Sequence, residues 1–414
     1  MKGWKEVQLK SITSKIGSGV TPKGGASVYI DKGTALIRSQ NIYNGSFEYK
    51  GLVFVNEITA YKMIGVEIFK NDILINITGD SVARCTIVPD NLLPARVNQH
   101  VAIIRCKEDV DSAFVMYSLT SPIYQAKLLS IATGAGATRN ALTKVILEDF
   151  KINLPPLPIQ LKVSSILSAY DNLIENNLKR IKLLEELAQR TYEEWFVKFR
   201  INGKQLKLNK ETGLPEGWTF GSLKELVSFQ NGFAFKSSKF TAEGQPVIKI
   251  KNIGNNTIDV TNTDCVDEDY AKTAEKFQVN EGDLLIAMTG ATVGKVGYLP
   301  YSVKKCYLNQ RVGRFINLKG SSNIHFVFSV MTQGSGLQQV LNLASGAAQP
   351  NISGDQILSL QTVIPTSDLL KNFNEIAETN IKQILTLLNQ NRLLKESRDI
   401  LLPRLMSGVI EVKA

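Results

Sequence analysis

The sequence predicts an α+β fold in which two related α+β domains alternate with two long antiparallel helices that pair as a coiled coil. Three observations predict this pseudo-twofold internal duplication. The 414 residues repeat one pattern twice. Each repeat opens with short apolar runs broken by Gly, Asn, Asp and Thr, and each closes with a long stretch of helical periodicity. The length suffices for two or three ordinary domains.

The duplication is clearest in one strand-like segment. Asp72–Gly79 (DILINITG) matches Asp283–Gly290 (DLLIAMTG) at an offset of 211, since 290 − 79 = 211. The same offset aligns further polar and proline positions, namely Asn41 with Asn252, Pro89 with Pro300, Asn98-Gln99 with Asn309-Gln310 and Asn140 with Asn351. A period this long indicates two copies of a whole domain with its helix, not a solenoid of short repeats.

Within each domain the apolar runs predict short strands, and longer apolar stretches predict helices. The expected strands are residues 53–55, 72–77 and 101–105 in the first domain and 246–250, 283–288 and 312–316 in the second. The expected helices are residues 113–131 and 324–343. The first domain is expected at residues 1–158, the second at 217–366, and a basic linker at 201–216.

Two long helices are expected at residues 159–200 and 367–407. The first follows the Pro-rich segment Leu154–Pro158 and has no Pro or Gly as far as Phe199. At an offset of 210 its apolar positions fall on those of the second helix, as Ile174 does on Ile384. Two equal stripes of this kind are expected to pair antiparallel. Asn177 and Asn391 lie on or beside the stripes, where they either fix the pairing register or face solvent or a partner chain.

Composition limits the class of protein. The formal net charge of +10 suits a polyanionic partner such as a nucleic acid. Four cysteines without a CxxC pair and only two histidines argue against a structural zinc site and a disulfide framework, as expected in a reducing cytoplasm. No stretch reaches the roughly 20 apolar residues of a membrane span, and the N-terminus lacks a signal-peptide core. A soluble, cytoplasmic protein is expected.

Several motifs together resemble one known family. LPEGW at Leu214–Trp218 leads into SLKEL, and the Pro-rich segment Leu154–Pro158 leads into DNLIENN at Asp171–Asn177 and LLEELAQ at Leu183–Gln189. With the Asp-Ile/Leu-Leu-Ile…Thr-Gly segment once per half, the chain resembles, over essentially its whole length, the specificity (S) subunit of type I restriction-modification systems. One departure is Ile159-Gln160, where that family usually has Glu-Gln, which puts a local contact in doubt.

The resemblance implies a function and a set of partners. Each domain would be a target recognition domain that reads one half of a split double-stranded DNA sequence. The paired helices would set the unread spacer and dock two methyltransferase (M) subunits, and restriction/translocase (R) subunits would join the complex. The chain itself would bind no cofactor, because S-adenosylmethionine, ATP and Mg would be held by the partner subunits.

The residues themselves favour a protein that is not an enzyme. An adenine methyltransferase needs a polar-Pro-Pro-aromatic loop, but Pro155-Pro156 is flanked by leucines, and no P-loop occurs. The histidines, His100 and His325, stand at positions that are not equivalent in the two repeats. Two alternatives remain at this point. One is a tandem-domain DNA-binding regulator without enzyme partners, and the other is a nuclease or methyltransferase with an unfamiliar site.

Four pairs of loops carry the polar and cationic side chains that base reading and phosphate binding need. The candidate DNA-binding residues are Arg38, Gln40, Lys249 and Lys251 in the first pair; Thr78, Gly79, Arg84, Thr289, Gly290, Thr292 and Lys295 in the second; Gln99, Gln310 and Arg311 in the third; and Thr138, Arg139 and Gln349 in the fourth. Asn98 and Asn309, identical in both halves, are expected to brace the fold instead. The alternative for the second pair is an ordinary turn between two strands, and the alternative for the fourth pair is a flexible connector.

Overall fold

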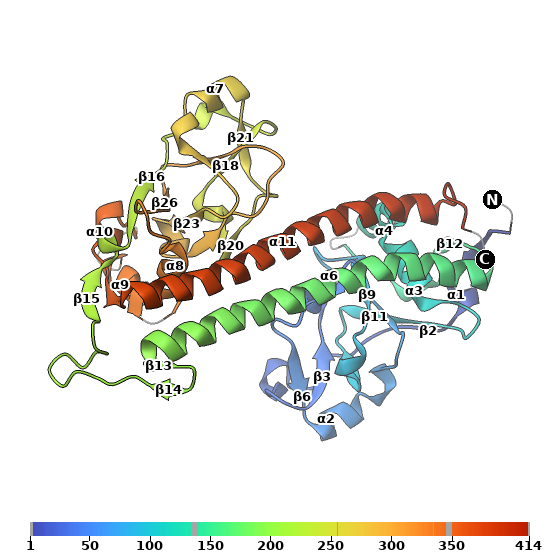
Figure 1. Cartoon of the computed structure of the whole chain (residues 1–414). Coiled ribbons are helices and arrows are strands. Elements are labelled where there is room, and N and C mark those ends of the chain that lie inside the picture. The colour runs from blue at the N-terminus through green and yellow to red at the C-terminus, as the bar shows by residue number, and fades with distance from the viewer. Residues whose placement is uncertain (1–2, 135–139, 255, 334, 345–349, 413–414) are drawn as a thin grey trace. The chain divides into compact units, whose positions relative to one another are not determined.

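The computed structural model describes residues 3–134, 140–254, 256–333, 335–344 and 350–412 (Figure 1). It contains two compact units. Unit 1 comprises Met1–Glu175 and Leu393–Ala414, and unit 2 comprises Asn176–Arg392. Each unit therefore contains one α+β domain and a part of both long helices.

The domain of unit 1 is built on two four-stranded sheets. The first has the order β6 (Val53–Val55), β3 (Thr34–Ile37), β10 (Ala95–Val97), β7 (Glu67–Ile68), and the second β2 (Thr13–Ser18), β11 (Val101–Cys106), β8 (Ile73–Asn76), β9 (Cys85–Ile87). Two further pairs are β1 (Lys5–Gln8) with β12 (Lys151–Leu154) and β4 (Ile42–Tyr43) with β5 (Ser46–Phe47). The α-helices of the domain are α1 (Leu9–Ile12), α2 (Glu57–Lys62), α3 (Ser112–Thr120), α4 (Pro122–Thr133) and α5 (Lys144–Asp149).

The domain of unit 2 has a six-stranded and a five-stranded sheet. The orders are β16 (Val227–Asn231), β26 (Val312–Asn317), β23 (Leu284–Ala287), β24 (Val296–Tyr298), β20 (Asn256–Ile258), β19 (Ile253–Gly254), and β17 (Phe240–Thr241), β21 (Asp264–Val266), β18 (Gln245–Ile248), β25 (Cys306–Leu308), β22 (Gln278–Val279). β15 (Thr219–Ser222) pairs with β27 (Gln361–Ile364), and β13 (Arg200–Ile201) with β14 (Lys204–Gln205) in the linker region. The helices are α7 (Glu268–Lys272), α8 (Ile324–Thr332), α9 (Ser335–Ala344) and α10 (Gly354–Leu358).

β8 and β23 lie inside their domains, which explains why their sequences are apolar without alternation. Ile73 and Ile75 enter one core cluster of unit 1, and Leu74 enters the other. In β23, Leu284 and Leu285 likewise belong to two different clusters. Alternate residues of a strand point to opposite faces, so a strand buried on both faces reads as a continuous apolar run.

The prediction of one helix at residues 113–131 is wrong. α3 ends at Thr120, and α4 begins at Pro122 after Ser121. Proline has no N–H to donate and fits the first turn of a helix, so a new helix starts here. The helix expected at 324–343 is likewise divided into α8 and α9.

The two long helices, α6 (Leu157–Tyr192) and α11 (Ser367–Met406), are the largest elements in Figure 1. α6 begins two residues earlier than expected, because Pro158 fits the first turn, and it continues into a π-helical turn, Glu193–Val197. The predicted offset of 210 is confirmed, because nine buried residues of α6 and its π turn all fall on buried residues of α11. They are Gln160, Val163, Ser164, Leu167, Ile174, Asn177, Ile181, Tyr192 and Phe196, matched by Leu370, Phe373, Asn374, Ala377, Ile384, Leu387, Asn391, Leu402 and Met406.

The helices pair antiparallel, as predicted. In unit 2, Asn177 bonds to Asn391, while Tyr192, later in α6, makes an edge-to-face contact with Phe373, earlier in α11. In unit 1, Asp171 forms an ion pair with Arg398 at 2.6 Å. The expected fold class of two α+β domains and two long antiparallel helices in an internal duplication is therefore confirmed. None of the helices in the described part of the chain has the length and hydropathy that a bilayer span requires.

Gln160, the residue beside the departure from the family pattern, attaches α6 to its domain. Its side chain is 2% exposed, accepts the backbone N–H of Asp111 at 3.0 Å and donates to the Pro155 carbonyl at 2.8 Å. In unit 2 the Asn374 side chain does the same work, accepting the N–H of Phe326 at 3.0 Å. Ile159 instead packs against the core of unit 1, so the contact needs no Glu at that position.

Candidate nucleic-acid interface

In each domain a buried or partly buried aspartate precedes the strand that leads to the candidate interface, Asp72 before β8 and Asp283 before β23. Asp72 is fully buried and accepts the backbone N–H of Phe69 at 2.7 Å and two bonds from Arg105 at 2.7 and 2.8 Å. Asp283 has the same role in unit 2, where it accepts from the Asn280 N–H and pairs with Arg314. These carboxylates hold the start of each strand, and each strand ends in the Thr-Gly turn that carries the candidate residues.

The first loop pair is braced by a buried asparagine. Asn41 accepts the N–H of Arg38 at 3.1 Å and donates to the Glu48 carbonyl at 2.9 Å. The guanidinium of Arg38 donates to the Gly51 carbonyl at 2.6 Å, and the Gln40 amide donates to the same oxygen at 3.1 Å. The Gln40 side chain is exposed, whereas Arg38 is half-buried.

The corresponding loop of unit 2 has the same brace with different side chains. Asn252 accepts the N–H of Lys249 at 3.0 Å, as Asn41 does in unit 1. Lys249 and Lys251 both form ion pairs with Asp264, at 2.8 and 3.1 Å, and these cations lower the pKa of its carboxyl group. Lys251 is exposed, while Lys249 lies over the Phe240 ring. Of the first loop pair, Gln40 and Lys251 are the residues most accessible to DNA.

The Thr-Gly turn of the second loop pair makes its hydrogen bonds inside the domain. Thr78 bonds to His100 Nδ1 at 2.7 Å. The Thr289 hydroxyl donates to the Pro350 carbonyl at 2.8 Å, and the Gly290 N–H donates to the same oxygen at 3.1 Å. Gly79 and Gly290 have φ of +77° and +75°, a left-handed conformation that favours glycine. These four residues shape the turn.

The cations of the second loop pair differ in accessibility. Arg84 is half-buried, with its guanidinium 4.8 Å from the centre of the Tyr43 ring. Lys295 is exposed, and its ammonium group has no ion-pair partner in the part of the chain that the structure describes. Thr292, beside it, donates to the Ile250 carbonyl at 3.2 Å. Lys295 is therefore the cation of this pair best placed for a phosphate.

The third loop pair shows the predicted bracing role of Asn98 and Asn309. Their side-chain oxygens accept the backbone N–H two residues later, from His100 at 3.2 Å and from Arg311 at 3.4 Å. The residue between, Gln99 or Gln310, is exposed. Arg311 is exposed as well and donates to the Asn351 side chain at 3.4 Å.

All these loops meet at one place in each domain, which we call the loop junction. In unit 1, the buried Asn76 amide donates to Ser39 of the first loop at 2.9 Å and to Ser81 of the second at 3.0 Å. The Ile77 N–H reaches the third loop at the His100 carbonyl, 2.9 Å away, and the Gly79 N–H reaches the fourth at Asn140, 3.2 Å away.

Unit 2 connects its loops in the same way. The Thr292 hydroxyl joins the second loop to Ile250 of the first, and the Met288 N–H donates to the Arg311 carbonyl of the third at 3.0 Å. The predicted residues Thr138, Arg139 and Gln349 of the fourth loop lie outside the described residues, and the described residue next to Gln349, Pro350, contacts the second loop.

A further loop adjoins the third, and the sequence pattern missed it. A Cβ added at Gly19 would lie 2.2 Å from the Val97 carbonyl oxygen, and one at Gly232 would lie 2.1 Å from that of Asn309. Only glycine allows this approach of the two backbones. The offset here is 213, since 232 − 19 = 213, and it also aligns two exposed lysines, Lys23 and Lys236. They are added to the candidate cations.

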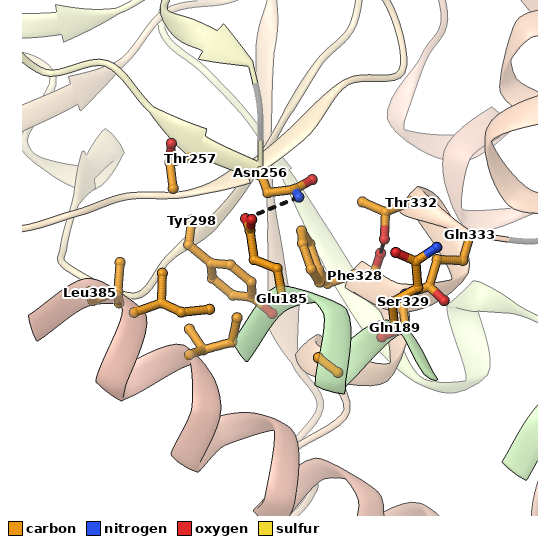
Figure 2. Close-up of a pocket in the computed structure, with 13 residues that line it drawn as sticks. Glu185, Gln189, Asn256, Thr257, Tyr298, Phe328, Ser329, Thr332, Gln333 and Leu385 are labelled. Atoms are coloured by element: carbon orange, nitrogen blue, oxygen red, sulfur yellow. Dashed lines mark hydrogen bonds between the residues drawn. The ribbon is translucent and has the colours of Figure 1, made fainter. Parts of the chain in front are cut away.

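A cavity of about 140 Å³ lies in unit 2 between α6, α8, α11 and β20, apart from the loop junction (Figure 2). Figure 2 shows Glu185 directed toward Asn256, whose amide donates to it at 3.3 Å. Burial raises the pKa of the Glu185 carboxyl. The described lining contains no histidine or cysteine, so it offers one carboxylate and neutral polar groups.

At positions equivalent to three residues that line the cavity, unit 1 has a polar cluster. There the Tyr117 hydroxyl donates to Asp171 at 2.5 Å, and Asp171 pairs with Arg398 at 2.6 Å. The equivalent positions of unit 2, at offsets of 212 and 210, carry smaller or apolar side chains, namely Ser329, Ile381 and Ala188, and all three line the cavity.

The Cys106 thiol and the His325 imidazole are largely buried, whereas His100 is exposed. Burial raises the pKa of the Cys106 thiol to about 11 and lowers that of His325, which bonds to Tyr298 at 2.8 Å, to about 4. Among the described residues no group of three or more His, Cys, Asp or Glu side chains is arranged to hold a metal ion.

Comparison with known proteins identifies the family. Residues 1–186 and 215–393 each match the model of the type I restriction modification DNA specificity domain. The type I restriction enzyme MjaVIII specificity subunit of Methanocaldococcus jannaschii is 27% identical over 381 residues, which cover 89% of this chain and 87% of that protein. The MjaIX specificity subunit of the same organism is 22% identical over 422 residues, covering 100% and 94%.

The fold also matches a solved structure. The crystal structure of the type I restriction-modification system S subunit from M. genitalium aligns with a TM-score of 0.64 at 15% identity, over 97% of this chain and 96% of that one. At this identity the likeness shows a common fold. Because the family model matches most of the chain, in two successive copies, the protein belongs to the family of type I restriction modification DNA specificity domains.

Proposed function

We propose that this chain is the DNA-recognition subunit of a type I restriction-modification complex, and that each of its two domains reads one half of a bipartite double-stranded target. Membership of the specificity-domain family and the names of the M. jannaschii relatives support this proposal. One observation carries it most directly. Two asparagines that brace the loops are kept in both domains, whereas several exposed residues on the same loops differ.

The bracing residues are those whose side chains bond to backbone within the loops. Asn41 and Asn252 are equivalent, and so are Asn98 and Asn309. Several exposed residues differ between the repeats, with Gln40 against Lys251 in the first loop and His100 against Arg311 in the third, while Gln99 and Gln310 are the same. Two readers of different base sequences need this combination, because base edges are distinguished by the donors and acceptors presented to them while the supporting geometry stays constant.

Phosphate contacts would come from the lysines around each junction. Lys295 is exposed and lies on the turn after β23, and Lys23 and Lys236 are exposed at equivalent places beside the third loop. Contacts of this kind orient a protein on the duplex without reading its sequence. The formal net charge of +10 is consistent with this affinity for a polyanion.

The chain acts without a catalytic site of its own in this proposal. Two methyltransferase subunits dock on the paired helices and bind S-adenosylmethionine, and restriction/translocase subunits use ATP and Mg for cleavage in the cytoplasm. The helices set the length of the unread spacer. The buried Cys85, Cys265 and Cys306 and the buried His325 support a passive role, because thiolate or imidazole catalysis needs an accessible group; the exposed His100 is bonded to Thr78.

The test is to purify the chain alone and together with its methyltransferase subunits. Selection from random duplex DNA with the complex should yield two short sequences separated by a constant unread spacer. The chain alone, incubated with labelled S-adenosylmethionine and the selected DNA, should transfer no methyl groups. A single continuous target, or methyl transfer by the chain alone, would overturn the proposal.

A further inference from the structure

The duplication leaves open which helix should pair with which. Nine buried positions of α6 and its π turn are matched by nine buried positions 210 residues later in α11. A second copy of α6 would therefore present its buried residues to α6 with the same spacing as α11 does. If the two surfaces were fully equivalent, two chains could exchange helices and form dimers in which like helices pair. Some feature has to distinguish α6 from α11.

Two neighbouring levels of the helix pair in unit 2 supply the difference. At the first level the Asn177 amide donates to the Asn391 side-chain oxygen at 2.9 Å. In an antiparallel helix pair the numbers of facing residues have a constant sum, which is 177 + 391 = 568 at this level. Because equivalent positions are 210 apart, the pseudo-twofold counterpart of this contact joins residue 391 − 210 = 181 with residue 177 + 210 = 387, again a sum of 568. These are Ile181 and Leu387, which belong to one buried cluster.

The internal symmetry is therefore broken at this point only by residue type. One level joins two amides, and its counterpart joins two aliphatic side chains. Asn177 is 6% exposed and Asn391 is 5% exposed, so neither amide is well solvated. In the described part of the chain the Nδ2 atom of Asn391 has no hydrogen-bond partner. A buried amide that loses its partner altogether is strongly unfavourable, so what stands opposite each asparagine matters.

Pairing between like helices would mismatch both levels. If α6 paired with a second α6 in the same antiparallel geometry, the numbers of facing residues would add up to 568 − 210 = 358. Asn177 of each copy would then stand opposite Ile181 of the other. For two α11 helices the sum would be 568 + 210 = 778, which places Leu387 opposite Asn391 of the second copy, twice. Each like pair therefore buries two amides against hydrocarbon. Only the pairing of α6 with α11 sets amide against amide and aliphatic against aliphatic.

We propose that Asn177 and Asn391 select the pairing of α6 with α11 and exclude dimers in which α6 pairs with a second α6 and α11 with a second α11. A single buried polar pair is known to fix register and partner choice in coiled coils, at some cost in stability. Here the two asparagines stand at positions that are not equivalent in the repeats, and this placement is what distinguishes the two helices.

The experiment removes the distinction at these two levels while keeping the apolar stripe and the Asp171–Arg398 ion pair. Asn177→Leu combined with Asn391→Ile gives both helices the same residues at both levels. Wild-type and variant chains, each prepared with two different fluorescent labels, are unfolded in urea, mixed and refolded, and the mass and the energy transfer between labels are measured. Wild-type chains should refold as monomers. The variant should form mixed dimers, with the dimerisation constant raised on the order of tenfold or more, because each buried amide mismatch shifts an equilibrium by about that factor.

A second variant separates matching from hydrophobicity. Ile181→Asn combined with Leu387→Asn sets amide against amide in every pairing, so its dimer fraction should also rise although its helices are more polar. Ile181→Leu combined with Leu387→Ile, the matched control, keeps the pattern and should stay monomeric. The proposal is overturned if both test variants refold as completely to monomers as the wild type, or if the control or the wild type dimerises as much as they do. No DNA or partner subunit enters the assay, so its outcome does not depend on the proposed function.

Discussion

Replacing Asp72 by Ala should destabilise unit 1 more than any exposed ion pair could. The Asp72 carboxylate is fully buried and accepts three hydrogen bonds, one from the Phe69 N–H and two from the Arg105 guanidinium. It stands at the start of β8, the strand that ends in the Thr-Gly turn of the loop junction. Its loss would therefore affect both the core and the candidate interface.

The magnitude follows from what the substitution leaves behind. Removing one partner of a buried ion pair typically costs about 3–5 kcal/mol, because the other charge stays uncompensated. Arg105 is 23% exposed, keeps a bond to the Glu67 carbonyl at 3.1 Å and lies over the Phe69 ring, all of which reduce the penalty. We therefore expect about 3 kcal/mol for Asp72→Ala. Asp283→Ala should cost less, about 2 kcal/mol, since that side chain is 25% exposed.

The assay combines urea denaturation with hydrogen exchange of the peptide that contains β8. The control is Asp149→Ala, which removes the exposed ion pair with Lys10, where both side chains are about half exposed, and should cost less than about 1 kcal/mol. If Asp72→Ala and Asp149→Ala gave the same loss of stability, or if exchange in β8 did not accelerate, the assigned role of Asp72 would be refuted.

Three further predictions concern pH, backbone approach and DNA affinity. Burial lowers the pKa of His325 to about 4, whereas the unfolded chain binds this proton near pH 6.5. The free energy of unfolding of unit 2 should therefore be unaffected by His325 above pH 6.5 and fall by about 3 kcal/mol as the pH is lowered to 4. Melting curves of His325→Gln should show a flatter pH dependence, and an unchanged one would contradict the burial argument. Gly19→Ala should lower the melting temperature, because its Cβ would lie 2.2 Å from the Val97 carbonyl oxygen. The control Gly17→Ala should leave it unchanged, because a Cβ there has no atom within 4 Å. Equal shifts of the melting temperature for both variants would refute the close approach. Lys295→Ala should weaken binding to all DNA sequences alike and reduce the salt slope by about one, so a loss confined to one base position would argue against a phosphate contact.

Much of the architecture could be predicted because it depends on periodic apolar patterns. β8 and β23 read as strands since both faces of each are buried, and the offset of 210 between α6 and α11 follows from the residues that are buried along both helices. Element ends were less predictable. Pro122 divides one expected helix and Pro158 lies inside another, because proline in a first turn starts a helix as readily as it precedes one.

The loops could be assigned to one site only in part. Asn98 and Asn309 were recognisable as braces because both repeats keep them. The bridge between the first and second loops was not recognisable, because Asn76 makes it in unit 1 and the Thr292 hydroxyl makes it in unit 2. Different side chains at positions that are not equivalent perform one task, and a comparison of repeats by identity cannot find such a pair.

Gaps in the repeat hid two other features. Gly19 and Gly232 align at an offset of 213 rather than 211, so the glycines that let a fifth loop approach the third were not matched. The cavity of unit 2 is lined by Ser329, Ile381 and Ala188, where unit 1 has Tyr117, Asp171 and Arg398. Its presence depends on three positions that come together only in the folded unit, which no local pattern reveals.

The independence of the two readers can be measured with two matched triple substitutions in the complex with methyltransferase subunits. One replaces Lys295, Gln310 and Arg311 by Ala in unit 2, and the other replaces Arg84, Gln99 and His100 by Ala in unit 1. Sequencing of the DNA selected by each complex should show relaxed base preference in one half-site for the first variant and in the opposite half-site for the second, with the other half and the spacer unchanged. Relaxation of the same half by both variants, or of both halves by either, would contradict the account.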